Sequence, residues 1–432
     1  MSTDEIILVV GATGYTGRLV VENLTKHSNR SFKLQLGGRS ASKLNALVSE
    51  LGLKGVETVV VDTLKEDQVN KAVQGASVVI ACAGPFHRCG TLVLAACARY
   101  GKHYTDITGE PWWIEEMIKK YDYLAFKSGA TIVPSGAFDS VPSDLLAFVG
   151  VQKLKEVAGL DVKVGKSITG HAVQGGVSGG TWTTLTSAFD EVPSSVIAKA
   201  IEPFTLSPVK GTSTGGRKLF FSFPKELGLR THGSLFFMAF TNISIVQRTW
   251  GLYESGQYSD KPTTELKYGD SFEYEEFMVL PGSKILSYFF SIFLLWGLLL
   301  LYTFPPARWL AHRWGPKAGS GPSEEVRKNG RYRGTNITSS IPSPSSPVTR
   351  YVKSTFKGTN DPGYGLGAVM VSEIALALLP SARSKLTPIG QKGGVLTPMS
   401  ALGFTLVERL NATDRITIES EEIVPSRTRK TQ

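Results

Sequence analysis

The chain has 432 residues, a length that accommodates two domains of ordinary size. Its hydrophobic fraction of 42% is that of a globular protein and excludes wholesale disorder. The net charge of +10 favours anionic partners, but the basic residues do not form arms interleaved with aromatic residues, so we expect no nucleic acid among them.

The first predicted element is a strand at residues 6–10, which is short, apolar and β-branched, as buried parallel strands are. A glycine-rich loop follows it at once and leads into a helical pattern at residues 18–26. A G-x-x-G-x-x-G loop between strand and helix lets the backbone approach a pyrophosphate, which the helix N-terminus then binds. The candidate cofactor-binding residues of this loop are Gly11, Thr13, Gly14, Tyr15, Thr16 and Gly17.

The second predicted strand, residues 32–36, leads into Arg39 and Ser40. An NAD enzyme usually has an acidic residue at this point, which accepts hydrogen bonds from the ribose hydroxyls. Arg39 and Ser40, together with Lys43, suit a 2′-phosphate instead, and they predict NADP(H) as the cofactor. The alternative is a solvated arginine at the start of a helix.

Two more strands are predicted at residues 57–61 and 76–81, with a helix at residues 66–73 between them. In a doubly wound sheet the carboxyl ends of the strands face the ligand crevice. Asp62 is therefore expected either near the adenine or as the cap of the following helix. The residues expected near the nicotinamide ribose are Ala83, Gly84 and Pro85.

Candidate catalytic residues lie at residues 103–106, which are expected to form the fifth strand and the loop at its carboxyl end, and after the sixth strand, which is predicted at residues 131–134. Tyr104 is positioned to donate a proton while Asp106 or Glu110 orients it or acts as a base. The alternative is that Tyr104 packs in the core and Asp106 caps a turn.

The third catalytic candidate, Asp139, follows the sixth strand together with Ser140 and so also lies at the crevice. The same stretch is equally typical of a helix start, with Ser140 as N-cap and Pro142 in the first turn. Both interpretations of Asp139 remain open.

The ordered motifs of the chain resemble those of the saccharopine dehydrogenase-like oxidoreductases, also called the trans-acting enoyl reductase group. The resemblance implies a Rossmann domain, a second domain that supplies the substrate surface and a dimer interface, and, in bacterial relatives, reduction of enoyl groups during complex-lipid synthesis. The matching motifs cover nearly the whole chain and lie at residues 9–17, 37–39, 83–86, 101–110, 136–144, 175–181, 361–365 and 393–398.

The expected fold class is α/β: an N-terminal Rossmann-type doubly wound parallel sheet, a second α+β domain for substrate and dimerisation, and a hydrophobic membrane-associating segment. The expected boundaries are residues 1–150 for the NADP domain, 151–282 with 318–432 for the second domain, and 283–317 for the membrane-associating segment.

That segment contains residues 285–304, twenty positions without a charged side chain, and twenty helical residues extend roughly 30 Å, the thickness of a bilayer core. Basic residues interleaved with Trp309 and Trp314 follow it, as in an interfacial belt. A single span would separate parts of one fold, so we expect an anchor on a membrane or lipid droplet with both ends cytosolic. A helix buried in the core or in a dimer interface is the alternative. Because the start of the chain carries acidic rather than basic residues, we expect no secretory signal peptide. The surface of a lipid droplet or of the endoplasmic reticulum suits such an anchor, and the family resemblance points to lipid droplets. The expected location is therefore the cytosolic face of a lipid droplet or of the endoplasmic reticulum.

Farther along, residues 315–350 are polar, and the Ser/Pro-rich residues 338–347 predict a surface loop. Apolar helical patterns at residues 369–379 and 402–410 are expected to pack in the second domain.

The spacing of Cys82, Cys89 and Cys97 matches neither a zinc site nor a disulfide framework, and His87 and His171 are isolated in the sequence. We therefore expect reduced thiols and no bound metal.

Three functions compete at this point. The first is an NADP(H)-dependent oxidoreductase that acts on a lipid or enoyl-type substrate. The second is a non-catalytic NADP(H)-binding scaffold or sensor on lipid droplets, favoured by the lack of a Tyr-x-x-x-Lys motif. The third is a saccharopine-type amino-acid dehydrogenase, which would need a cluster of basic residues for its carboxylates, and no such cluster accompanies the motifs.

Overall fold

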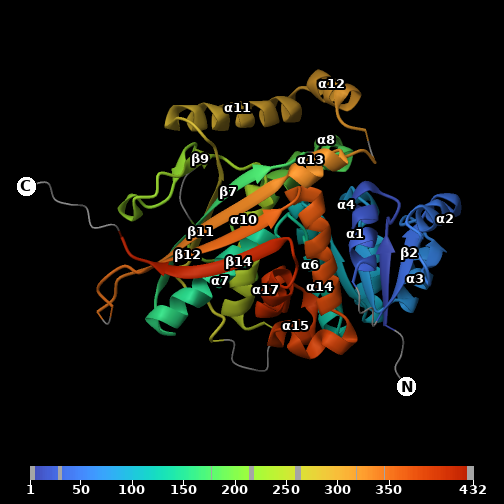
Figure 1. The fold of residues 1–432 in the computed structure, drawn as a ribbon, viewed down its shortest axis with the longest axis horizontal. Coiled ribbons are helices and arrows are strands. Elements are labelled where there is room, and N and C mark those ends of the chain that lie inside the picture. Colours follow the sequence, from blue (N-terminus) through green and yellow to red (C-terminus); the bar gives the residue numbers. More distant parts are fainter. Residues whose placement is uncertain are drawn as a thin grey trace, which may run out of the picture.

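The computed structural model describes residues 5–27, 32–176, 178–213, 218–257, 264–317, 319–344 and 346–425. Val177, within the glycine-rich motif at residues 175–181, lies outside these residues. Two seven-stranded sheets organise the described part of the chain, with helices packed around them (Figure 1).

The first sheet is the predicted doubly wound sheet. Its paired strands are parallel, in the order β13-β6-β5-β4-β1-β2-β3. All residues of β4 and the last four of β1 are buried, as expected for strands that helices cover on both faces. The strands are β1 (Glu5–Val10), β2 (Phe32–Gly38), β3 (Glu57–Val60), β4 (Val78–Ala81), β5 (His103–Asp106), β6 (Thr131–Val133) and β13 (Gly394–Val395).

Helices alternate with these strands along the chain. The helix predicted at residues 18–26 begins three residues earlier, at Tyr15, because Gly14 has an extended backbone and serves as its N-cap residue. The helices of this half are α1 (Tyr15–Thr25), α2 (Ala41–Glu50), α3 (Glu66–Gly75), α4 (Phe86–Cys89), α5 (Thr91–Tyr100) and α6 (Pro111–Ser128).

The second sheet is mixed, in the order β14-β12-β11-β7-β10-β9-β8. Only β7 and β10 pair in parallel among its described strand pairs; the others are antiparallel. Its strands are β7 (Val164–Gln174), β8 (Phe221–Ser222), β9 (His232–Ser234), β10 (Glu273–Val279), β11 (Arg331–Ser340), β12 (Tyr351–Thr359) and β14 (Ile416–Ile423).

The prediction of a surface loop from residue 338 onward is wrong at its start, because β11 continues to Ser340 in the middle of the second sheet. Its polar side chains find partners on β7: the Asn336 amide donates to Ser167 Oγ at 2.8 Å and to Thr169 Oγ1 at 2.9 Å. Paired polar groups can be buried at little cost, so polarity here does not indicate a loop.

The remaining helices surround the second sheet and its junction with the first. The apolar pattern at residues 369–379 forms α14, whereas the pattern at residues 402–410 is divided at Gly403, whose positive φ of 52° separates two helices. These elements are α7 (Val141–Ala158), α8 (Gly179–Glu191), α9 (Ser194–Ala200), η1 (Lys225–Leu227), α10 (Ala239–Ser255), α11 (Lys284–Thr303), α12 (Pro305–Trp314), α13 (Glu324–Asn329), η2 (Pro362–Leu366), α14 (Gly367–Ala377), η3 (Pro380–Lys385), α15 (Pro388–Lys392), α16 (Pro398–Leu402) and α17 (Phe404–Asn411).

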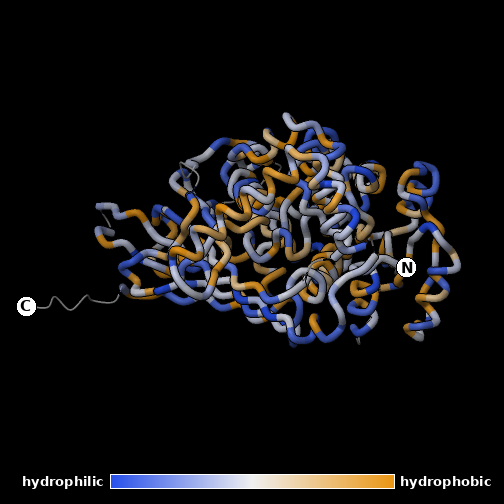
Figure 2. Tube along the Cα trace, turned by 90° about the horizontal axis from the view of Figure 1, so that it is seen from above, coloured by the Kyte–Doolittle hydropathy of each residue, from blue (hydrophilic) through white to orange (hydrophobic). Residues whose placement is uncertain are grey.

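The two halves share one hydrophobic core. A single buried cluster extends from Ile7 of β1 through Leu145 of α7 to Phe356 of β12, and hydrophobic segments recur along the whole length of the molecule (Figure 2). In addition, β13 pairs with β6 in the first sheet, although residues 394–395 fall in the range predicted for the second domain. The C-terminal residues thus complete the cofactor sheet.

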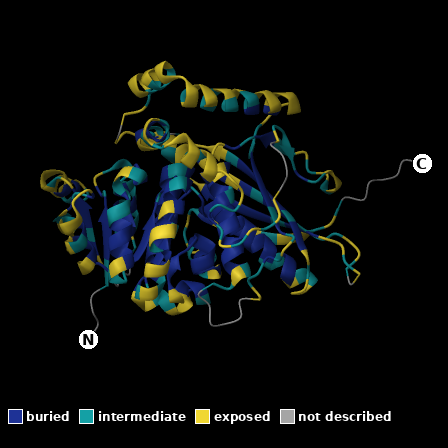
Figure 3. Cartoon of the chain, turned by 180° about the vertical axis from the view of Figure 1, so that it is seen from behind, coloured by how far each residue is buried: buried dark blue, intermediate teal, exposed yellow. Residues whose placement is uncertain are grey.

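The apolar segment forms α11, which lies with α12 along one face of the molecule and contacts the second sheet at β9 (Figure 1). Most of α11 is exposed or half-buried (Figure 3), and its buried residues are Ser287 and Ser291, which face the protein. The alternative of a helix buried in the core of this chain is therefore wrong.

Candidate active site

The glycine-rich loop joins β1 to α1 at the carboxyl edge of the first sheet. Gly17 lies so close to Gly11 that a β-carbon on it would overlap the Gly11 carbonyl oxygen. Gly14 has no side chain to cap the first turn of α1, so the N-terminus of this helix is open to an anion. This geometry fits a bound pyrophosphate. Thr13 is exposed at this edge, and Thr16 is half-buried.

Tyr15 links this loop to the segment that follows α12. Its hydroxyl donates to the Pro322 carbonyl oxygen at 2.6 Å, and its ring meets that of Tyr364 edge-on at 5.3 Å. The guanidinium of Arg327 lies over the same ring, and burial raises the pKa of Tyr15 to about 12. The contacts shown by Tyr15 are thus to the second half of the chain.

Arg39 lies directly after β2, at the same edge of the sheet. Its side chain is exposed, and no hydrogen bond or ion pair within the described residues engages it. Ser40 caps α2 by accepting a hydrogen bond from the Lys43 backbone N–H. Arg39 is therefore free to contact a 2′-phosphate, and its neighbours fit the predicted cofactor.

The residues predicted after β3 and β4 lie at the same edge. One carboxylate oxygen of Asp62 accepts from the Leu64 backbone N–H at 3.1 Å, which stabilises the turn before α3. After β4, Ala83 is half-buried and Gly84 exposed, while Pro85 is buried before α4. Since all of these strands are parallel, the four loops share one crevice.

Tyr104 and Asp106 are fully buried and bonded to each other. The Tyr104 hydroxyl donates to Asp106 Oδ2 at 2.7 Å, while Asp106 Oδ1 accepts from the backbone N–H groups of Thr108 and Ser135 at 2.9 Å each. Burial outweighs these hydrogen bonds and raises the pKa of Asp106 to about 7. The pair joins the loops after β5 and β6, and this arrangement favours its structural interpretation.

The Glu110 carboxylate also forms hydrogen bonds within the protein. Its carboxylate accepts from the backbone N–H groups of Phe86 at 2.6 Å and His87 at 2.9 Å, and it meets the His87 ring at 2.7 Å. It thereby satisfies the N-terminus of α4 and fixes the loop that begins at Ala83.

Asp139 differs from these carboxylates because its Oδ1 atom is buried and has no hydrogen-bond partner. The hydroxyls of Thr105 and Ser140 are likewise buried and unpartnered, and they belong to the same carboxyl edge of β5 and β6. Burial, and secondly the charge of Glu276, raise the pKa of Asp139 to about 7. Ser140 occupies the N-cap position of α7 without a side-chain capping bond. Unsatisfied polar groups gathered at one crevice suit a ligand.

Sequence reasoning did not identify the cluster around Glu276 of β10. This fully buried carboxylate contacts Ser143 Oγ at 2.7 Å, Tyr274 Oη at 2.9 Å and His171 Nε2 at 3.2 Å, and the Asn242 amide at 2.8 Å. His171, isolated in the sequence, is therefore part of a network. No spacing motif announces it, because its members come from four separate elements.

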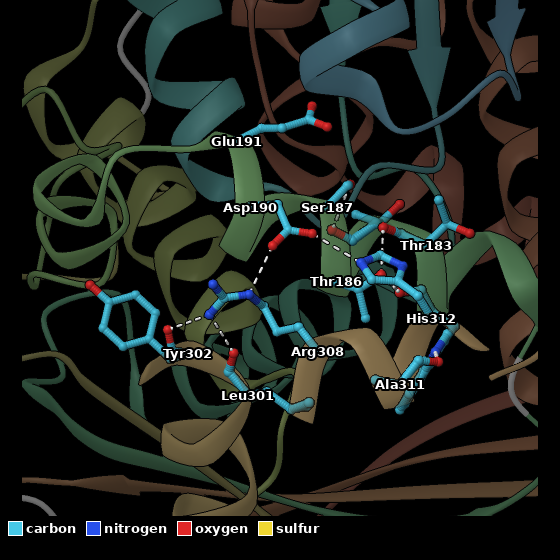
Figure 4. A network of polar contacts seen from close by, with 12 residues as sticks. Thr183, Thr186, Ser187, Asp190, Glu191, Leu301, Tyr302, Arg308, Ala311 and His312 are labelled. Carbon is cyan, nitrogen blue, oxygen red and sulfur yellow. Dashed lines mark hydrogen bonds and ion pairs between the residues drawn. The ribbon is translucent and has the colours of Figure 1, made fainter. Parts of the chain in front are cut away.

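Helix α8 connects the crevice to the apolar segment. Asp190 accepts from Arg308 Nε at 2.8 Å and meets His312 Nε2 at 2.9 Å, while Arg308 also donates to carbonyl oxygens at the end of α11 (Figure 4). The neighbouring Glu191 pairs with Arg88 of α4, where Arg88 Nε lies 2.6 Å from it. Helix α8 thus contacts both α12 and α4, the short helix that follows the loop after β4.

Comparison with known proteins agrees with this geometry. The family model for the saccharopine dehydrogenase NADP-binding domain matches residues 7–133, which confirms the predicted resemblance and cofactor. Among solved structures, apo saccharopine dehydrogenase (L-Glu forming) from Saccharomyces cerevisiae aligns with a TM-score of 0.49 and 13% identity, over 97% of this chain and 100% of that one.

Curated relatives align over nearly the full length. A Mycobacterium tuberculosis protein designated a candidate trans-acting enoyl reductase is 32% identical over 94% of this chain and 95% of its own length. The trans-acting enoyl reductase of Mycobacterium bovis is 29% identical with the same coverage. The one from Mycobacterium ulcerans is 30% identical over 94% of this chain and 96% of its own.

Proposed function

We propose, from the premise that this chain belongs to the trans-acting enoyl reductase family, that it reduces the enoyl group of a lipid or lipid-like substrate in lipid or glycolipid metabolism. The chain is an NADP-dependent oxidoreductase with a saccharopine dehydrogenase-type NADP-binding domain. The observation that carries the finer proposal is the half-buried Asp139 at the crevice, whose Oδ1 atom is buried without a hydrogen-bond partner.

Reduction of a conjugated carbon–carbon double bond needs a hydride and a proton. NADPH supplies the hydride when it is bound, so the protein must position the substrate and deliver the proton. A carboxyl group whose pKa lies near 7 is half protonated at neutral pH and is well matched to this task. We assign proton donation to Asp139, because Tyr104 and Asp106 are already bonded to each other.

The test is NADPH oxidation by the purified full chain with a series of 2-enoyl lipids, their saturated counterparts serving as blanks. We expect turnover with NADPH in preference to NADH and at least tenfold slower turnover by Asp139→Asn. Arg39→Asp should weaken NADPH binding while leaving NADH binding unchanged. Turnover of carboxylate-rich amino acids instead, or of no substrate while NADPH still binds, would contradict the proposal.

We further propose that α11 and α12 lie on the cytosolic face of a lipid droplet or of the endoplasmic reticulum. By length and composition, α11 is the one described helix that qualifies as a candidate membrane span, and only 11% of its apolar window is buried. The side chains of Phe293 and Trp296 are 74% and 67% exposed. Since β10 before it and β11 after it belong to the same sheet, in-plane attachment preserves the fold, whereas a span would divide it.

Helix α12 adds the features of an interfacial segment. Trp309 and Trp314 are exposed, and Arg313 and Lys317 are exposed near them. Tryptophan rings favour the headgroup level, and basic side chains favour anionic headgroups. An anionic lipid surface therefore suits both the tryptophan rings and the basic side chains of this segment. A substrate taken from that surface would pass α8 on its way to the crevice.

Co-flotation with phosphatidylcholine vesicles, with and without phosphatidylserine, tests this location. We expect the chain to float, more strongly with phosphatidylserine, and the Phe293→Lys/Trp296→Lys double variant to remain in solution with unchanged NADPH binding. The matched control replaces two exposed apolar residues elsewhere, Leu160→Lys/Val348→Lys, and should float like the wild type. If the wild type does not float, or forms a dimer that only the α11 variant dissociates, then α11 is a protein interface.

A further inference from the structure

A fully buried carboxyl group, that of Glu276, adjoins the loop of the proposed proton donor. Glu276 is 2% exposed, and its two carboxylate oxygens accept hydrogen bonds from side chains on α7, β7, α10 and β10 itself. An ionised carboxylate is stable away from water only when such partners replace its hydration. The four partners therefore hold Glu276 in one position and in one charge state.

This network surrounds the loop that carries Asp139. On one side, Ser143 lies one helical turn after Asp139 and bonds directly to Glu276 at 2.7 Å. On the other side, the ring of Phe138 packs edge-on against Tyr332 at 5.0 Å, and the Tyr332 hydroxyl meets His171 Nδ1 at 2.8 Å.

A third contact with this loop region comes from α10. Thr241, the neighbour of Asn242, donates to the Gly109 carbonyl oxygen at 2.9 Å. A β-carbon on Gly109 would lie 3.1 Å from Asp139 Oδ2. The same helix turn thus positions Glu276 through Asn242 and confines Asp139 through Gly109.

The two carboxyl groups have opposite preferences for the proton. Burial raises the pKa of Glu276, but the charge of His171 and the hydrogen bonds from His171, Ser143 and Asn242 outweigh it, so the pKa is lowered overall. For Asp139, burial and the charge of Glu276 both raise the pKa. Neighbouring acids whose pKa values are driven apart mark a division of roles between a fixed charge and a proton donor.

We propose that Glu276 is a positioning residue of the active site, whose fixed negative charge holds the proton on Asp139 until the substrate takes it. This inference rests on the proposed enoyl reduction. NADPH, when bound, would supply a hydride with its two electrons to one carbon of the double bond, whose π bond opens, and would be left as NADP⁺. The Asp139 proton adds to the other carbon, and the Asp139 carboxylate regains a proton from water.

Other titratable groups adjoin Asp139 from the surrounding elements. His171 on β7 bonds to both Glu276 and Tyr332 on β11, and Tyr274 on β10 bonds to Glu276. Asp106 on β5 bonds to the Ser135 N–H of the same loop. Burial is the larger cause of the raised pKa of Asp139, and Glu276 is the charge that adds to it, so removal of this charge is the informative change.

The experiment compares Glu276→Gln with Glu275→Gln in the full chain. Adjacent residues in a strand point to opposite faces of the sheet, and Glu275 instead pairs with Lys166 and Lys218. The readout is the pH dependence of kcat/KM for NADPH-dependent enoyl reduction. Since the neutral amide removes the negative charge that adds to the effect of burial on Asp139, Glu276→Gln should move the alkaline fall in activity to lower pH. Glu275→Gln should leave the midpoint unchanged, and an unchanged midpoint in Glu276→Gln overturns the proposal.

A substrate-free measurement separates this proposal from the enoyl reductase assignment. The infrared carbonyl band of a protonated carboxylic acid, identified by its loss in Asp139→Asn, should titrate near neutral pH in the wild type. It should titrate at lower pH in Glu276→Gln. If the band is absent at neutral pH, the pairing is refuted even where Glu276→Gln fails to fold. If the band titrates as expected but no enoyl lipid is reduced, the carboxyl pair stands and the proposed reaction falls.

Discussion

Replacing Gly11 by alanine tests how closely the loops after β1 and β4 must approach to hold the dinucleotide. Gly11 has a φ of +80°, and a β-carbon built on it lies 2.9 Å from the Ala83 backbone nitrogen. Ordinary contact begins near 3.4 Å, so the two loops would have to separate by about half an ångström. The left-handed backbone costs an alanine about 1–2 kcal/mol, and the packing strain adds about 1–3 kcal/mol.

Both effects are measurable in the purified chain. The free energy of unfolding from urea denaturation should fall by about 2–5 kcal/mol in Gly11→Ala. The same separation of the two loops should weaken the hold on the dinucleotide, so NADPH affinity from fluorescence titration should fall below that of the wild type.

Two other glycines supply matched controls. Gly52 has a φ of +59° with no atom within 4 Å of its β-carbon position, so Gly52→Ala should show the backbone cost alone and keep NADPH affinity. Gly75 has open space and an ordinary φ, so Gly75→Ala should be neutral or slightly stabilising. If folded Gly11→Ala binds NADPH as tightly as Gly52→Ala does, the reasoning about the two loops is refuted.

Three further predictions concern the buried carboxyls and α12. Because the pKa of Asp139 is raised from 3.8 to about 7, the folded chain binds more protons than the unfolded chain between these values. The free energy of unfolding should therefore decrease as pH rises through that window, and Asp139→Asn should flatten the decrease in pH-resolved denaturation; an unchanged slope contradicts the raised pKa. Tyr104→Phe leaves Asp106 Oδ2 buried without a partner, which should cost about 1–3 kcal/mol in urea denaturation, and a neutral effect would argue against the structural role of this pair. Asp190→Asn should change global stability by less than about 1 kcal/mol, since Asp190 is exposed in both of its ion pairs, yet hydrogen exchange in α12 should accelerate; unchanged exchange would show that other contacts hold α12.

The cofactor half of the fold was largely predictable because its signals are local. A strand, a glycine-rich loop and a helix follow one another between residues 5 and 25. The apolar strands indicated the parallel sheet, and Arg39 after β2 indicated the cofactor. These patterns arise from backbone chemistry that nearby residues fix on their own.

The second half was less predictable because its strands and site depend on distant partners. The polar strand β11 depends on distant partners: β12 pairs with it, and β7 presents Ser167 and Thr169 to the Asn336 amide. Glu276 shows no motif of its own, since its partners on α7, β7 and α10 become neighbours only after folding. The same holds for β13, a two-residue strand too short to give a period.

The place of β13 in the first sheet also determines when that sheet can be finished during synthesis. Until residues 394–395 leave the ribosome, β6 presents an open edge that can pair with any other extended chain. The amino-terminal half emerges first but cannot complete its sheet alone, so domain-by-domain folding during translation is incomplete. A nascent chain stalled before residue 394 would therefore depend on chaperones. The sheet that holds NADP(H) would be complete only after residues 394–395 have been made.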